Sequence, residues 1–122
     1  MKIEKKRETL ETSIQLLLSD ERDAKESKID TGVGFFDHML TLFSFHSGLY
    51  LEVKADGDTE VDDHHTVEDI GILLGESIRE LYQERVSYRR YGFMYLPMDE
   101  SLARVVLDLS GRPHLNFQAQ FS

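Results

Sequence analysis

The residues best suited to chemistry lie in one short segment, residues 62–69, which reads Asp-Asp-His-His-Thr-Val-Glu-Asp. The segment holds two histidines and four carboxylates within eight residues. An apolar pattern with a spacing of three and four residues follows at once and predicts a helix that runs to about Glu84. Because a helix turns by about 100° per residue, His64 and Glu68 share one face, and His65 lies between Glu68 and the flank.

Imidazole and carboxylate groups at this spacing indicate a metal site, since residues four apart on a helix can hold one ion. We expect Asp62 or Asp63 to cap the helix, so that its first turn presents His64, His65 and Glu68 together. The alternative is a charged helix start with two solvated histidines. The chain has no cysteine, so any metal must be held by imidazole and carboxylate, which suit Mn, Fe, Zn or Ni.

Composition narrows the possible partners. The chain has 122 residues, enough for a single domain with a modest core, and 40% of them are apolar. A net charge of −9 argues against nucleic acid as a partner, because phosphate binding needs a basic surface. No segment resembles a signal peptide, and no apolar run reaches the roughly 18 residues of a membrane span. We therefore expect a cytoplasmic protein that binds no membrane.

The elements that must position these residues can be expected from hydrophobic periodicity. Alternating patterns predict strands at residues 3–18, 29–32, 49–55, 91–96, 102–109 and 114–121, with a break at 97–100. Apolar stripes predict a mostly buried helix at residues 34–46, with Gly48 just past its C-terminus, and the second helix that starts at the histidine pair. This order predicts an α/β (α+β) fold in which helices pack on one face of a mixed β-sheet.

Other residues in these elements are candidates for a site. His38 interrupts an apolar stripe beside Asp37 and is a candidate ligand, whereas His46 could equally be a core histidine bonded to backbone. The basic segment 84–90 stands out in an acidic chain and is either a solvated loop or an anion site, because guanidinium groups fit a phosphate monoester. Within the second helix, Gly71 and Gly75 predict close approach of another element.

Six motifs occur together in one order along the chain. They are residues 7–12 (Arg-Glu-Thr-Leu-Glu-Thr), 31–40 (Thr-Gly-Val-Gly-Phe-Phe-Asp-His-Met-Leu), 62–69, 90–92 (Arg-Tyr-Gly), 97–100 (Pro-Met-Asp-Glu) and 108–113 (Asp-Leu-Ser-Gly-Arg-Pro). In these motifs the chain resembles the imidazoleglycerol-phosphate dehydratase family. That family dehydrates imidazole glycerol phosphate to imidazole acetol phosphate in histidine biosynthesis. The resemblance implies one and a part of two βα repeats of the dehydratase (ribosomal-S5-domain-2-like) fold.

The resemblance implies a site with two Mn²⁺ ions. In the family, the positions of His38 and His65 share one ion, and those of His64 and Glu68 bind the other. Ligand type alone also suits Zn²⁺ or Fe²⁺.

The resemblance also implies residues that contact the small phosphorylated imidazole substrate. Arg90 and Arg112 match the arginines that hold its phosphate, and His46 ends a substrate-contacting segment. Glu11, which pattern alone would make a solvated edge residue, matches an acidic residue at the substrate. Glu11 and Glu68 are the predicted catalytic residues.

Two departures from the family pattern matter. The family chain continues into a second half with another His-His-x-x-Glu motif, so we expect residues 1–122 to form one truncated domain with an incomplete site. Leu42 stands where many members have glutamine. The family forms large homo-oligomers, shells of 24 subunits, in which neighbouring subunits share sites.

A mechanism follows as a hypothesis. The substrate's imidazole ring, held between two metals as an imidazolate, could expel the hydroxyl group, and Glu11 could then act in proton transfer. The alternatives are a metal-dependent phosphoesterase, since two metals with nearby arginines also suit phosphate hydrolysis, and an inactive metal-binding fragment.

Overall fold

The computed structural model describes residues 1–10, 12–23, 25–57 and 63–121. The chain divides into two compact units, Met1–Val86 and Ser87–Ser122.

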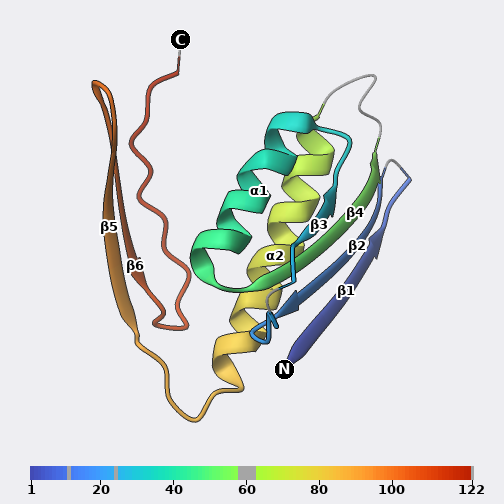
Figure 1. Cartoon of the computed structure of the whole chain (residues 1–122), viewed down its shortest axis with the longest axis horizontal. Helices are drawn as coiled ribbons and strands as arrows, with labels where there is room; N and C mark the ends of the chain where they lie inside the picture. Colours follow the sequence, from blue (N-terminus) through green and yellow to red (C-terminus); the bar gives the residue numbers. More distant parts are fainter. Residues whose placement is uncertain (11, 24, 58–62, 122) are drawn as a thin grey trace. The chain divides into compact units, whose positions relative to one another are not determined.

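The first unit is a mixed four-stranded sheet with two helices on one of its faces (Figure 1). Its elements are β1 (Lys2–Glu8), β2 (Thr12–Ser19), β3 (Lys28–Asp30), α1 (Gly34–Ser47), β4 (Tyr50–Gly57) and α2 (His64–Gln83). The strand order is β1-β2-β4-β3, in which β3 runs parallel to β4 and the other pairs are antiparallel. The predicted mixed sheet with helices on one face is therefore confirmed.

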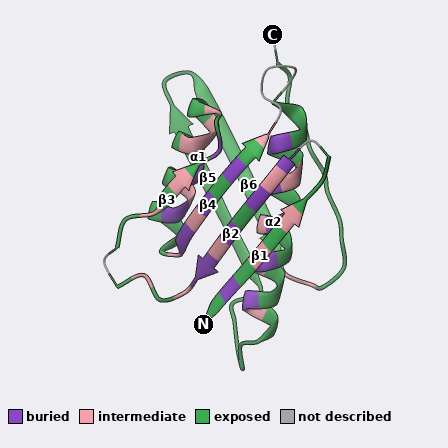
Figure 2. Cartoon of the chain, turned by 90° about the vertical axis from the view of Figure 1, so that its right-hand side faces the viewer, coloured by how far each residue is buried: buried purple, intermediate pink, exposed green. Residues whose placement is uncertain are grey.

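The core lies between this sheet and the helices. Buried and more exposed residues alternate along the two central strands (Figure 2). Ile14, Leu18 and Leu51 of these strands are fully buried and form one core cluster with Ile70 of α2. The opposite face of the sheet is polar, as the alternation within each strand requires. One buried face is enough to fix the register of the strands, because a shift by one residue would expose every one of these side chains.

The first predicted strand, residues 3–18, is in fact two strands joined by a turn. The turn is closed by a hydrogen bond from the Thr9 amide to the Thr12 carbonyl (2.8 Å) and by one from the Thr12 amide to the Thr9 hydroxyl (3.0 Å). The prediction was wrong because threonine, a residue typical of strands, here uses its hydroxyl group to stabilise a turn.

The prediction for α1 is partly confirmed. The helix ends at Gly48, which has a φ of 73° and is the predicted C-terminal glycine. The expected wide buried stripe is wrong, since among its apolar side chains Leu40 is buried whereas Phe35 and Phe45 are 73% and 66% exposed. An apolar pattern shows which residues avoid water, but it does not show what covers them.

The predicted close approach to α2 is also wrong. Side-chain atoms added at Gly71 or Gly75 would meet no described atom within 4 Å. The close approach occurs at Gly57 of β4, where a Cβ atom would overlap the hydroxyl of Thr66. No helix in the described part of the chain is long and apolar enough to cross a membrane.

The second unit is an antiparallel ribbon of β5 (Tyr91–Met98) and β6 (Ser101–Asp108). The break predicted at residues 97–100 falls slightly later, because Pro97 still pairs with Leu102 and the turn begins at Asp99, which has a φ of 49°. The strand predicted at residues 114–121 is not present in the described residues up to 121. Both faces of a two-stranded ribbon are open, and Phe93 is 73% exposed.

Candidate functional site

The candidate ligands of the first unit come from one end of its sheet. Strand β3 leads into α1 and β4 leads into α2, and these two parallel strands end on the same side (Figure 1). Both helices therefore begin at this end, with His38 early in α1 and the His64–His65 pair opening α2. The turn between β1 and β2 lies at the same end, since Thr12 at the start of β2 pairs with Gly57 at the end of β4.

His64 and Glu68 form the only predicted ligand pair that the described residues bring into direct contact. The Nε2 atom of His64 lies 3.2 Å from the Oε2 atom of Glu68, one helical turn along. The ring of His65 lies 5.7 Å from that of His64, measured between centroids. The His64 and Glu68 side chains are 68% and 56% exposed, so the contact contributes little to stability and its atoms remain accessible to an ion.

The start of α2 matches the expected cap in position but, for Asp63, not in its side-chain hydrogen bond. Asp63 is the N-cap residue, but its side chain makes no capping hydrogen bond, and its carbonyl accepts one from the Val67 amide at 3.0 Å. The expected cap position at Asp63 is therefore confirmed, whereas the side-chain hydrogen bond of a cap is not formed by Asp63. Asp62, the other predicted cap, lies outside the described residues.

The donor set fits a hard or intermediate divalent cation such as Mn²⁺, because it consists of imidazole nitrogens and a carboxylate oxygen. Within the described part of the chain, no group of three or more His, Asp or Glu side chains lies close enough together to hold an ion. The exposed His38 lies at the same end as the pair, and it forms no group of three such ligands with other described residues. The first unit thus offers two contacting ligands and two further histidines nearby in the fold.

Arg90 of the second unit is engaged by a carboxylate. Its Nε atom donates to Asp108 Oδ1 at 2.6 Å, its Nη2 atom donates to Oδ2 at 3.2 Å, and its guanidinium lies 4.9 Å from the Tyr91 ring centroid. The hydrogen bonds from Arg90 lower the pKa of Asp108 below its usual 3.8, and the nearby charge of Arg112 lowers it further. The two predicted phosphate ligands thus lie near one carboxylate, which an incoming phosphate would have to displace or share.

The other two residues predicted to contact the substrate are Glu11 and His46. Glu11 lies outside the described residues, although its neighbours Thr9 and Thr12 are fastened together as described above. His46 lies in the last turn of α1, at the end opposite His38, and its ring packs edge-on against Phe45 at 5.1 Å. The first unit therefore does not bring His46 to the end at which the candidate ligands lie.

Sequence reasoning gave no role to Asp69 or Thr12. Thr12 donates a 2.7 Å hydrogen bond to Asp69, which joins the β1–β2 turn to α2. The available signal was the position of Asp69 four residues after His65, on the same side of the helix.

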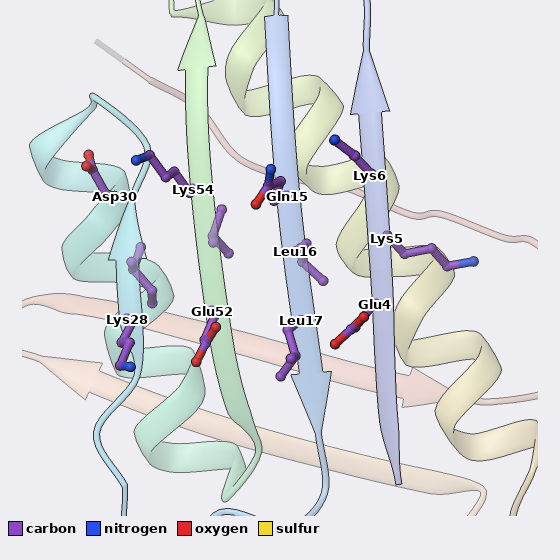
Figure 3. Close-up of a pocket in the computed structure, with 12 residues that line it drawn as sticks. Glu4, Lys5, Lys6, Gln15, Leu16, Leu17, Lys28, Asp30, Glu52 and Lys54 are labelled. Carbon is purple, nitrogen blue, oxygen red and sulfur yellow. The ribbon is translucent and has the colours of Figure 1, made fainter.

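A hollow on the first unit does not coincide with these residues. It is an open depression of about 660 Å³ on the sheet face opposite the helices (Figure 3). Its floor includes Leu17, and lysine and acidic side chains such as Lys28, Glu52 and Lys54 surround it. Opposite charges alternate here, so the hollow has no preference for one class of ion and is typical of a solvated sheet face.

Comparison with known sequences decides the family. The sequence pattern of imidazoleglycerol-phosphate dehydratase matches residues 31–122. The chain belongs to the imidazoleglycerol-phosphate dehydratase family. It is 59% identical over all 122 residues to the imidazoleglycerol-phosphate dehydratase of Staphylococcus carnosus and 56% identical to that of Staphylococcus saprophyticus. The chain spans 63% and 62% of the lengths of these two imidazoleglycerol-phosphate dehydratases.

Solved imidazoleglycerol-phosphate dehydratase structures share the fold. The crystal structure from Staphylococcus aureus subsp. aureus N315 matches with a TM-score of 0.88 and 49% identity, over the whole of this chain and 66% of that one. The structure from Pyrococcus furiosus, in complex with (S)-C348, matches with a TM-score of 0.79 and 36% identity. It covers 95% of this chain and 60% of that one. The dehydratase fold expected from the motifs is thereby confirmed.

Proposed function

We propose that the natural protein dehydrates imidazole glycerol phosphate to imidazole acetol phosphate, a step of histidine biosynthesis. Family membership supports the reaction, and the 3.2 Å contact between His64 and Glu68 is the observation in this chain that carries it. A hydro-lyase acting on this substrate needs a group that binds the ring, a group that binds the phosphate and a residue that moves protons. The chain offers candidates for each.

The ring-binding part of the proposal rests on two Mn²⁺ ions. His64 and Glu68 would hold one ion, and His38 and His65 would contribute to the other, with Zn²⁺ or Fe²⁺ as possible substitutes. When bound, the ions supply positive charge that lowers the pKa of a coordinated imidazole ring. The same end of the sheet supplies all four side chains, which supports a shared site.

Substrate binding and proton transfer would fall to the remaining candidates. Arg90 and Arg112 would bind the phosphate, which suits a guanidinium fork and would fix the distance from phosphate to ring. Glu11 would take or return a proton at the carbon chain of the substrate, with Glu68 contributing as both a ligand and a charged neighbour. His46 would contact substrate only across a subunit boundary, since α1 carries it to the far end.

The proposed assembly follows from the incomplete set of metal ligands in the described residues. We propose a large cytoplasmic homo-oligomer in which neighbouring subunits and further parts of the natural protein complete each site. This agrees with the absence of a third ligand around His64 and Glu68 in the described residues. Nucleic acid and membranes are not proposed as partners, in keeping with a net charge of −9.

The test is product identification. The natural protein, loaded with Mn²⁺, is incubated with imidazole glycerol phosphate, and the products are separated and their masses are determined by mass spectrometry. Loss of one water with the phosphate retained supports the proposal. Release of inorganic phosphate would instead identify the metal-dependent phosphoesterase, and an unchanged substrate would leave a metal-binding protein without this activity.

A further inference from the structure

A partly buried polar cluster joins the β1–β2 turn to the start of α2. The Thr12 hydroxyl donates to Asp69 Oδ2 at 2.7 Å, and the Asp69 side chain is only 13% exposed. Arg7 adds an ion pair of 3.2 Å from its Nε atom to Asp69 Oδ1, although its angle is not that of a hydrogen bond. A carboxylate so little exposed is stabilised only while such partners are in place.

The hydrogen bonds in this cluster have a defined direction. A carboxylate can only accept, so Thr12 must donate its hydroxyl proton to Asp69. The Thr12 oxygen then accepts from the Thr9 hydroxyl at 2.9 Å, and the Thr9 oxygen accepts from the Thr12 amide at 3.0 Å. Both ends of the β1–β2 turn are thus connected, through Thr12, to a single carboxylate on α2.

The first turn of α2 is also seated directly on the sheet. Thr66 is fully buried against Gly57, which has no Cβ atom and so allows the helix to approach β4. Gly57 in turn pairs with Thr12 across the sheet. The same few residues therefore fix the position of the β1–β2 turn and of the helical turn that carries His64, His65 and Glu68.

We propose that Asp69 is a positioning residue, which holds the β1–β2 turn in register with the metal-binding turn of α2. In this role Asp69 acts through its contacts with Thr12 and Arg7. The role rests on the proposed function, because the turn that Asp69 holds contains Glu11, the expected acid/base residue. Without Asp69, the three ligands His64, His65 and Glu68 stay on one continuous helix, whereas the β1–β2 turn loses its fixed distance from them.

The experiment compares Asp69→Ala with Glu80→Ala in the natural protein. Glu80 is a matched control, because it forms an ion pair with Lys5 that also links α2 to β1, but 11 residues further along the helix. For Asp69→Ala we expect kcat to fall by about tenfold or more, while KM and Mn²⁺ content stay within about twofold. Amide hydrogen exchange in residues 9–12 and 64–69 should accelerate by about tenfold. Glu80→Ala should leave kcat and both exchange rates unchanged.

Four outcomes would overturn the proposal. A normal kcat, loss of Mn²⁺ from Asp69→Ala, unchanged exchange in residues 9–12, or an equal effect of Glu80→Ala would each refute it. If Asp69→Ala does not fold, Thr12→Val decides, since it removes only the hydroxyl donor and must reproduce the fall in kcat and the faster exchange. An inactive wild-type protein would refute the proposed function, and the exchange measurement would still decide whether Asp69 joins the two turns.

Discussion

Nε2 of His64 lies 3.2 Å from Oε2 of Glu68, in the first turn of α2 and exposed to solvent. A histidine and a glutamate four residues apart can form an ordinary surface pair or two ligands of one ion. The two cases differ in what happens when one partner is removed. A surface pair would change stability only slightly, whereas a ligand pair would change metal content.

Glu68→Gln and His64→Ala should each lower the Mn²⁺ content of the natural protein and its turnover together. Glutamine keeps the size of the side chain but lacks the negative charge that favours a bound cation. Glu76→Gln, at an exposed position of the same helix, is the control and should retain both properties. Metal analysis after dialysis checks this. Normal metal content in His64→Ala would remove His64 from the ligand set.

Glu11→Gln should retain Mn²⁺ and lose turnover by about 10²–10⁴-fold, the usual loss when a general acid or base is removed. The amide can still accept and donate hydrogen bonds but cannot exchange a proton near neutral pH. Glu8→Gln, three residues earlier at the exposed end of β1, is a suitable comparison and should remain active. Steady-state kinetics with metal analysis on the same samples give the answer. A Glu11→Gln protein with wild-type kcat would show that another group moves the proton.

Arg90→Ala should raise KM by about 10- to 100-fold with a smaller effect on kcat, because a phosphate clamp supplies mainly binding energy. The neighbouring Arg89→Ala is the matched control and should change KM by less than about twofold. Asp108→Asn is a second variant for the same question. It removes the negative charge that holds the Arg90 guanidinium, so KM should fall if Asp108 competes with the substrate phosphate for Arg90. An unchanged KM in Arg90→Ala would leave Arg90 as part of the β5–β6 ribbon only.

Asp20 should make the stability of the first unit depend on pH. The hydrogen bond from the Met1 ammonium (2.8 Å) lowers the pKa of Asp20 below 3.8 and raises that of the Met1 amine above 8.0. The Asp20 contribution is therefore present above pH 3.8 and is lost as the pH falls through its folded pKa. The Met1 contribution is present below pH 8.0 and is lost as the pH rises through its folded pKa.

Thermal unfolding of wild type and Asp20→Asn across pH checks this expectation. The difference in Tm should be largest between about pH 4 and 8 and should shrink on both sides. Glu26→Gln, an exposed position in the following loop, serves as the control with no such profile. A Tm difference that does not vary with pH would show that Asp20 stabilises through packing rather than charge.

Much of this fold could be predicted because its signals are local. The helix from His64 and its buried face, the glycine that ends α1 and the strand at Tyr50–Gly57 are all marked by residues within one or two turns. The motif in residues 62–69 likewise predicted that His64 and Glu68 would share a helix face, and they do. What could be predicted, then, was set by propensity, periodicity and spacing.

The rest depends on partners distant in sequence. Residues 114–121 alternate as a strand does, but a strand needs a neighbouring strand to bond with, and alternation alone does not supply one. The glycine that allows close approach is Gly57 rather than Gly71, because the contact depends on where α2 crosses β4. Asp69 could not be assigned from sequence for the same reason, since Thr12 is 57 residues away.

The central claim is that the first turn of α2 holds a metal ion. Crystals of the natural protein grown with Mn²⁺ and measured by anomalous diffraction at the Mn absorption edge test it most directly. We expect an anomalous peak bonded to both His64 Nε2 and Glu68 Oε2, with the direct contact between these two atoms replaced by the ion. Fully occupied Mn²⁺ elsewhere in the protein, with His64 and Glu68 still in direct contact, would contradict it.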